Sequence, residues 1–186
     1  QIIEAAIQTV AELGFGRASL AQIARKAGIS KSVIGYYFPT RDDLVRQAVD
    51  HFYVTGHESM ASQMDSVTSA TELLRSYIAS NIAYIDTNRV AVRAIGDIVA
   101  NFRAPDGRLV YRVEDTEPLI QGTQAMFAWG QETGEFRAFD TRVMAVMLRG
   151  CMDAFGQQLT SYPGLSVATY TSEVTDLFIQ AARNTA

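Results

Sequence analysis

The sequence predicts an all-α fold of about nine helices, and three observations lead to that class. Apolar residues recur at helical spacing along most of the chain, only 4 prolines interrupt its 186 residues, and Ser, Thr or Asp precedes most apolar segments as a helix cap. Hydrophobic residues make up 48% and charged residues 19%, as in an ordinary globular protein. We expect two modules, a small one over residues 1–46 and a larger one over residues 47–186.

The first two helices are predicted from an apolar stripe and a cap. The first helix ends at Gly14-Phe15-Gly16, after apolar residues that share one face: Ile3, Ile7, Val10 and Ala11. Ser19 heads the second helix and forms a capping box with Gln22, in which each side chain satisfies a free backbone N–H. Gly28 then permits a sharp turn.

A short third helix and a long fourth helix follow. Ser30 caps the third helix, which runs only to about Tyr37 because Pro39 keeps the residue before it out of helical geometry. Thr40 caps the fourth helix, over about residues 41–60. This helix begins apolar and becomes polar, so we expect it to link the two modules.

Five further helices complete the larger module. Turns at 65–68 and at Pro105-Asp106-Gly107 separate them, and capping residues Ser69, Asp140 and Ser166 open three of them. The expected ranges are about 69–86, 88–102, 118–134, 140–160 and 167–183.

Charge singles out the region of the second and third helices. Residues 15–41 contain no Asp or Glu, whereas the rest of the chain has a balance of −9. An acidic protein that keeps one uncompensated basic segment is expected to use it on a polyanion, and nucleic acid is the first candidate. The basic residues of the segment are Arg17, Arg25, Lys26, Lys31 and Arg41.

The third helix is expected to present hydroxyls and rings to solvent. With Ile34 at the inward pole, 100° per residue puts Phe38 on the same face and Ser32 and Tyr36 opposite. Tyrosine and serine hydroxyls bind phosphate oxygens, and a short helix fits the major groove of DNA. The alternative is a helical hairpin whose surface tyrosines are incidental.

At these residues the chain resembles the TetR family of transcriptional regulators. The resemblance covers residues 1–50 and is weaker downstream, where Gly134-Glu135-Phe136 is similar to many family C-terminal domains. It implies a three-helix, helix-turn-helix DNA-binding domain followed by a helical ligand-binding and dimerisation domain. The matching motifs are Gly14-Phe15, the run Ser19–Ala27, Gly28-Ile29-Ser30-Lys31, and Tyr36-Tyr37-Phe38-Pro39-Thr40-Arg41-Asp42-Asp43-Leu44.

The resemblance also implies roles for single residues. Ser19 would bind a phosphate at the start of the second helix, and Arg41 would bind the DNA backbone from the start of the fourth. Two positions depart from the family, which often has tyrosine in place of Gly35 and threonine in place of Val33. These changes remove one phosphate contact and make one base contact apolar, so we expect Val33 to meet a thymine methyl. The residues expected to face DNA are Lys31, Ser32, Val33, Tyr36 and Tyr37.

The larger module carries no catalytic signature, so we predict no enzyme activity, no cofactor and no metal. His51 and His57 are six residues apart and cannot form an i, i+4 metal pair. Arg93 and Asp97 are expected to form a solvated ion pair. Because Cys151 is the only cysteine and no apolar run reaches the length of a membrane span, we expect a cytoplasmic protein without a membrane partner.

Two features of the larger module indicate a ligand and a second subunit. Apolar stripes with few polar groups on three of its helices suit either plain core or a cavity for a small effector. The candidate effector residues are Asn81, Met126, Trp129, Met147 and Cys151. A second face of residues 140–160, with Val146, Gly150 and Asp153, and a broad apolar face of residues 167–183 predict a four-helix homodimer interface or packing within one subunit.

The sequence therefore predicts a transcriptional regulator, a homodimeric repressor that binds near-palindromic double-stranded DNA and is released by a small, largely apolar effector. Two alternatives stay open. One is an all-α enzyme that uses the C-terminal cavity, and the other is a helical interaction protein whose DNA-binding motif has decayed.

Overall fold

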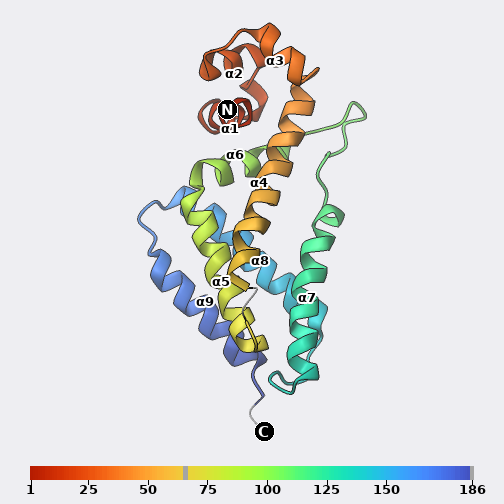
Figure 1. Cartoon of the computed structure of the whole chain (residues 1–186), viewed down its shortest axis with the longest axis vertical. Coiled ribbons are helices and arrows are strands. Elements are labelled where there is room, and N and C mark those ends of the chain that lie inside the picture. Colours follow the sequence, from red (N-terminus) through yellow and green to blue (C-terminus); the bar gives the residue numbers. More distant parts are fainter. Residues whose placement is uncertain (65–66, 185–186) are drawn as a thin grey trace. The chain divides into compact units, whose positions relative to one another are not determined.

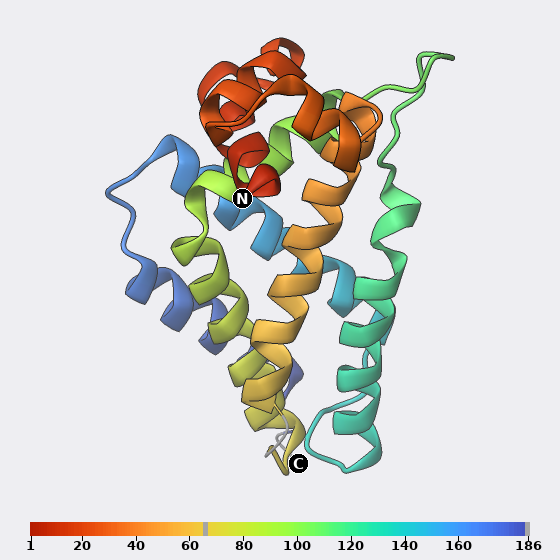
Figure 2. The same ribbon diagram turned by 45° about the horizontal axis from the view of Figure 1, so that its top comes forward.

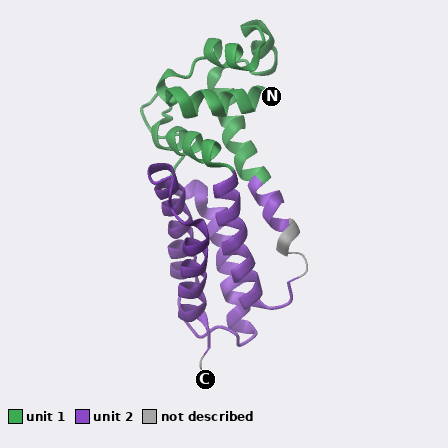
Figure 3. Cartoon of the chain, turned by 90° about the vertical axis from the view of Figure 1, so that its left-hand side faces the viewer, with its two compact units in different colours: residues 1–55, 88–112 green, residues 56–87, 113–186 purple. Residues whose placement is uncertain are grey.

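The computed structural model describes residues 1–64 and 67–184, except the side chains of residues 62–64, and it groups the chain into two compact units. Unit 1 comprises residues 1–55 and 88–112, and unit 2 comprises residues 56–87 and 113–186 (Figure 3). The described residues form nine α-helices and two 3₁₀-helices. Isolated β-bridges join Arg103 to Leu109 and Phe136 to Arg183. The all-α prediction is confirmed.

The compact units do not coincide with the modules expected from the sequence. Residues 88–112 group with the N-terminal residues, because α6 (Arg89–Asn101) packs against α1 (Ile2–Leu13) through one shared core. The helix α4 (Arg41–Met64) runs through the boundary between the units without a break. A functional division at residues 46 and 47 stays a prediction.

Unit 1 contains the helices that the sequence predicts for its residues, together with one 3₁₀-helix that the sequence did not indicate. Besides α1, the first part of α4 and α6, they are η1 (Phe15–Arg17), α2 (Leu20–Ala27) and α3 (Lys31–Tyr37) (Figure 1). The capping box of Ser19 and Gln22 is present, with the Ser19 backbone N–H donating to Gln22 Oε1 at 2.8 Å. Thr40 and Asp43 cap each other in the same way at the start of α4.

Two apolar clusters hold unit 1 together. One lies beneath α2 and α3, where Ile23, Ile34 and Leu44 are fully buried. The other joins α1, α4 and α6 around residues such as Val10 and Ile98. Each fully buried side chain of this size contributes about 1.5–3 kcal/mol relative to exposure, so α2 and α3 are placed by burial rather than by helix propensity.

Unit 2 is a bundle around a single apolar cluster, to which its four long helices contribute. The turn expected at 65–68 begins on two residues that lie outside the described part of the chain. The Asp140 and Ser166 caps are present, each accepting a backbone N–H three residues later. The elements are α5 (Ala70–Thr87), η2 (Val113–Thr116), α7 (Glu117–Glu132), α8 (Thr141–Ser161) and α9 (Val167–Ala182) (Figure 1).

The segment Gly134-Glu135-Phe136 ties the ends of the bundle helices together. Gly134 takes a left-handed φ of 77°, which ends α7 and turns the chain. The Glu135 carboxylate accepts the backbone N–H groups of Ala70 at 2.8 Å and Thr71 at 3.0 Å, so it caps α5 from a distant part of the chain. Phe136 inserts its ring into the core.

Unit 2 is expected to lose stability in acid through Glu135. Burial raises the pKa of this carboxyl, but hydrogen bonds from the Thr71 and Ala70 backbone outweigh burial and leave the pKa below its ordinary value of 4.5. A lowered folded-state pKa gives stability that is present above pH 4.5 and is lost as the pH falls through the folded value. In urea unfolding, Glu135→Gln should cost about 0.5–2 kcal/mol at pH 7. The difference in unfolding free energy between the variant and wild type should shrink toward pH 3. A difference that stays constant with pH would contradict this role of Glu135.

Candidate nucleic-acid interface

The helix α3 is anchored along one face only. Its Ile34 is fully buried, and Phe38, the residue just after its end, is buried in the same cluster. Gly28 supplies the turn before it with a left-handed φ of 70°, and the Ser30 hydroxyl accepts the Val33 N–H at 3.3 Å. The face opposite Ile34 is therefore turned outward.

The five α3 residues that the sequence singles out share this outward surface, which we call the α3 face. Tyr36 is 83% exposed, Tyr37 62% and Val33 42%, and Lys31 and Ser32 are also exposed. The two tyrosine rings meet edge to face with centroids 5.1 Å apart, so they form one aromatic ridge. Lys31 has no ion-pair partner among the described residues. A cation, two hydroxyl-bearing rings and an apolar side chain thus stand together in solvent.

Ser19 lies at an exposed position, but its hydroxyl is used within the cap. It donates to Gln22 Oε1 at 2.8 Å and accepts the Gln22 N–H at 3.4 Å. A phosphate at this position would therefore compete with Gln22 for the hydroxyl hydrogen. Its role in DNA binding stays a prediction.

Arg41 is directed toward the protein itself rather than into solvent. Its Nε donates to the Ala18 carbonyl at 2.6 Å, its Nη2 donates to the Phe15 carbonyl, and its guanidinium carbon lies 4.2 Å from the centre of the Phe15 ring. These contacts fix the first turn of α4 to η1. In this structure Arg41 positions the start of α4, and its contact with the DNA backbone stays a prediction.

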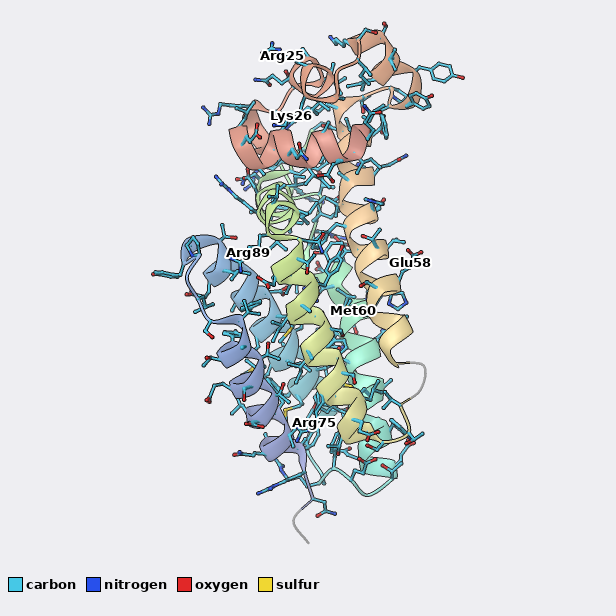
Figure 4. All side chains as sticks on the ribbon, turned by 60° about the vertical axis from the view of Figure 1, so that its left-hand side comes forward. Arg25, Lys26, Glu58, Met60, Arg75 and Arg89 are labelled. Atoms are coloured by element: carbon cyan, nitrogen blue, oxygen red, sulfur yellow. The ribbon has the colours of Figure 1, made fainter. Side chains whose placement is uncertain are left out.

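The basic segment carries less uncompensated charge than the sequence suggests. Lys26 forms an ion pair with Glu12 of α1, which a count over residues 15–41 cannot register. Arg17 turns its Nε to the Leu13 carbonyl at 2.7 Å. Figure 4 shows Arg25 extending outward from α2 while Lys26 lies toward α1. One of the five cations is therefore compensated, because α1 brings an acidic side chain to α2.

Asp97 does not pair with Arg93, and the expected solvated ion pair was wrong. Its carboxylate accepts the Phe15 backbone N–H at 2.6 Å and the Asn101 amide at 2.7 Å, because η1 leaves that N–H without a helical partner. The Phe15 ring also packs against Phe102 with centroids 5.4 Å apart. Phe15 therefore joins α6 to the start of α4, a connection that no local sequence pattern indicates.

Four of the five candidate effector residues lie in or against the core of unit 2. Asn81 is buried and donates to the Tyr77 carbonyl at 2.8 Å, Met126 belongs to the core, and Trp129 and Cys151 pack against it. Burial raises the pKa of the Cys151 thiol, which favours its neutral form. The structure thus places three of these four in one apolar cluster and buries Asn81 in the same unit, and effector binding by them stays a prediction.

Met147 does not lie with the other four, because it is 62% exposed on the outer face of α8. The interior face of α8 is instead formed by Ala145, Leu148, Met152 and Phe155. Apolar residues occupy both faces of this helix, so the sequence pattern alone cannot distinguish the inner face from the outer one. The placement of Met147 on an inward face was wrong.

Sequence reasoning missed a polar pair inside unit 2. The Thr123 hydroxyl of α7 lies 3.2 Å from the Tyr77 hydroxyl of α5 and also donates to the Leu119 carbonyl at 2.9 Å. Thr123 is buried, so this pair is a polar group within an otherwise apolar cluster. A tyrosine and a threonine at separate helical positions give no recognisable signal before the helices are packed.

The described residues offer neither a metal-binding cluster nor a membrane-crossing helix. No group of three or more His, Cys, Asp and Glu side chains lies close enough there to hold a metal ion. Among the same residues, no helix combines the length and the apolar character that a membrane crossing requires.

Comparison with known proteins identifies the segment that carries the α3 face. Residues 2–48 match the sequence model of the bacterial regulatory proteins of the tetR family. The HTH-type transcriptional regulator BetI 1 of Chromohalobacter salexigens is 26% identical over 117 residues, which are 62% of this chain and 58% of that protein. The chain thus spans little more than half the length of this curated relative.

Solved structures match the whole chain. The fatty acid degradation regulator FadR of Bacillus halodurans superposes with a TM-score of 0.81 at 20% identity, covering 98% of each chain. A transcriptional regulator of Saccharomonospora viridis, solved in complex with choline, gives 0.79 at 21% identity over 98% of this chain and 96% of that one. At this identity the likeness establishes the fold. Residues 2–48 are thus similar to the tetR family of bacterial regulatory proteins, and the chain as a whole has the fold of these solved regulators.

Proposed function

We propose that this protein is a homodimeric transcriptional repressor that binds double-stranded DNA through the α3 face and is released by a small, largely apolar effector. The carrying observation is the exposed α3 face, on a helix whose opposite side is buried, within the segment that matches the family. Hydroxyls and a lysine on a short outward helix suit phosphate and base contacts in the major groove. A two-fold dimer would place two such helices about 34–36 Å apart.

The outer face of α8 supports the dimer. Val143 and Met147 are each about 60% exposed there, Val146 is exposed beside them, and Leu177 is exposed on α9. Large apolar side chains exposed on these two helices favour burial against a second copy of the chain. Met147 therefore belongs to the proposed subunit interface rather than to the effector site.

The dimer is expected to depend on Met147. Met147→Glu would bring a charge into an apolar interface twice, once from each subunit, and should convert a dimer into a monomer of 20.4 kDa. Sedimentation equilibrium measures this directly, with Gln47→Glu on an exposed position of α4 as the charge-matched control. A wild-type chain that sediments as a monomer, or a variant that stays dimeric, would contradict the interface.

The core of unit 2 supports the effector site. Met126 belongs to its apolar cluster, Trp129 packs against it, and Asn81 is buried on α5. The Tyr77–Thr123 hydroxyl pair supplies a polar group that could orient a ligand. The structural relatives include a fatty acid degradation regulator and a protein bound to choline. A panel of fatty acyl, steroid-like and quaternary ammonium compounds is therefore the first set to screen.

The chain offers two covalent routes by which an effector could influence α3. One is α4, which is continuous from unit 1 into unit 2, and the other is the direct succession of α5 and α6. Both routes meet at Phe15. Its backbone N–H donates a hydrogen bond to the Asp97 carboxylate of α6, and its carbonyl accepts one from Arg41 of α4. Release requires that the effector bind more tightly to the arrangement that does not fit the operator.

Selection of bound fragments from the source genome by purified protein tests the proposed function. We expect a near-palindromic sequence, bound with an affinity that falls steeply with salt and is lost on addition of one member of the effector panel. Absence of selective binding would favour a helical interaction protein. Turnover of a panel member would favour an enzyme.

A further inference from the structure

The positive charge of unit 1 is not confined to the helix-turn-helix. Residues 1–55 carry six basic and five acidic side chains, whereas residues 88–112 carry five basic and two acidic ones. The whole of unit 1 has a net charge of +4, and residues 56–87 with 113–186 have −8. Residues 88–112 therefore add a net charge of +3 to unit 1, besides the basic segment of residues 15–41. The basic residues are Arg89, Arg93, Arg103, Arg108 and Arg112.

The segment after α6 is an ordered two-stranded hairpin, which we define as residues 102–112. Arg103 and Leu109 form an antiparallel bridge, and backbone hydrogen bonds of 2.8 Å join Ala104 to Arg108 and Val110 to Phe102. Gly107 closes the turn with a φ of 83°, which favours glycine. Figures 1 and 2 show this hairpin projecting from unit 1 after α6. Backbone hydrogen bonds within the hairpin itself join its two sides close to the tip.

The tip of the hairpin presents two arginines and one acid. The Arg108 side chain is 85% exposed, and its Nε lies 3.7 Å from Asp106 Oδ2, a loose surface contact. The Arg103 Nη1 donates to the Gly107 carbonyl at 3.1 Å, which aligns its guanidinium with the turn. The other acid of residues 88–112, Asp97, is occupied by the Phe15 N–H and by Asn101. The tip therefore has an excess of exposed positive charge.

The base of the hairpin is anchored next to the start of α4. The Phe102 ring packs against Phe15, and the Arg46 guanidinium lies 5.0 Å from the centre of the Phe102 ring. Arg41, which precedes Arg46 on α4, covers the Phe15 ring. The hairpin and the first turns of α4, which directly follow α3, are thus fixed to each other through stacked rings and guanidinium groups.

We propose that this hairpin is a second DNA-binding element, whose Arg103 and Arg108 bind backbone phosphates flanking the half-site that the α3 face contacts. The inference rests on the proposed function and adds a contact outside the helix-turn-helix. Guanidinium groups bind phosphate oxygens in a bidentate manner, and short basic arms commonly reach DNA beside a helix in the major groove. The hairpin contributes affinity and salt dependence rather than base selectivity.

The test compares two lengths of duplex. One is the minimal selected operator, and the other extends it by one helical turn, about 10 base pairs, on each side. On the extended duplex, Arg108→Gln should lower the slope of log K against log salt by about 0.9 for each lost phosphate contact, and so by about 1.8 in a dimer. Arg103→Gln combined with Arg108→Gln should roughly double that change. The minimal duplex should show little change.

Two control variants separate the contact from general charge effects. Arg75→Gln removes one exposed cation from unit 2 and should leave the salt slope unchanged. Arg108→Lys keeps the charge and should retain most of the slope. Thermal unfolding of each variant should match wild type, because the side chain is exposed.

Three results would overturn the inference while leaving the proposed function intact. These are an unchanged slope on the extended duplex, an equal loss on both duplexes, and an equal loss in Arg75→Gln. Weaker dimerisation in Arg108→Gln with unchanged DNA affinity would also overturn it, since the hairpin would then contact a second copy of the chain. Failure of wild type to bind either duplex selectively would remove both the inference and the proposed function.

Discussion

Replacing Tyr36 with alanine is expected to abolish most operator binding without unfolding the protein. The side chain is 83% exposed, so its truncation should change stability by no more than about 0.5 kcal/mol. A base or closely held phosphate contact contributes about 1–3 kcal/mol, and a dimer loses two. The expected loss of binding free energy is therefore about 2–6 kcal/mol, which corresponds to an affinity that is weaker on the order of 30-fold or more. Fluorescence anisotropy with the selected operator measures it.

Lys31→Ala should behave differently from Tyr36→Ala. Removing a phosphate-binding cation should weaken binding to all sequences and lower the salt slope by about 1 per subunit. Tyr36→Phe keeps the ring and loses only the hydroxyl, so it separates stacking from hydrogen bonding. Tyr162→Ala, at a tyrosine of unit 2 that is 61% exposed, is the matched control and should bind normally. Normal operator affinity in Tyr36→Ala would contradict the α3 face as the DNA-binding surface.

Gly130→Ala is expected to destabilise unit 2 strongly. A Cβ at this position would lie 2.1 Å from Cδ2 and 2.4 Å from Cε2 of Phe136, well inside contact distance. The ring cannot move away easily, because the Phe136 N–H donates to the Gly130 carbonyl and the neighbouring Arg137 N–H donates to the Ala182 carbonyl. We expect a loss of about 3 kcal/mol, the upper end for overpacking, in urea unfolding.

The same helix provides the control. Gly122 also lies in α7, and a Cβ added there would meet no neighbouring atom within 4 Å, so Gly122→Ala should stabilise the protein by about 0.5–1 kcal/mol through helix propensity. Adding Phe136→Leu to Gly130→Ala should recover part of the loss, because the smaller side chain leaves room for the methyl group. Two alanine variants with equal stabilities would show that the ring adapts at no cost.

Local features of unit 1 could be predicted because their causes are local. The Ser19–Gln22 box, the Gly28 turn and the Ser30 cap each depend on residues within four positions of one another. The outward orientation of Tyr36 followed from its spacing from Ile34. Two residues along a helix turn the side chain by about 200°, which puts Tyr36 opposite the buried Ile34. The residues of the exposed α3 face could therefore be predicted from the sequence. The hydrogen bonds that Ser19 and Arg41 make within the protein could not.

Contacts between distant residues could not be predicted in the same way. The Asp97 bond to Phe15 and the Glu135 cap on α5 each join residues more than 60 positions apart, and both use backbone N–H groups that carry no side-chain signal. The prediction of which face of α8 is turned inward was wrong for a related reason. An apolar residue such as Met147 gives the same pattern whether its helix face meets the core or a second subunit.

The amino-acid sequence by itself determined the helices, their caps and the exposed face of α3, because these follow from hydrogen bonding and periodicity over a few residues. The tertiary structure decided that α6 packs with the N-terminal helices, that Arg41 turns to Phe15 and that α8 turns Met147 outward. Those outcomes depend on which surfaces exclude water together. That choice is made by the packed chain as a whole and not by any one segment.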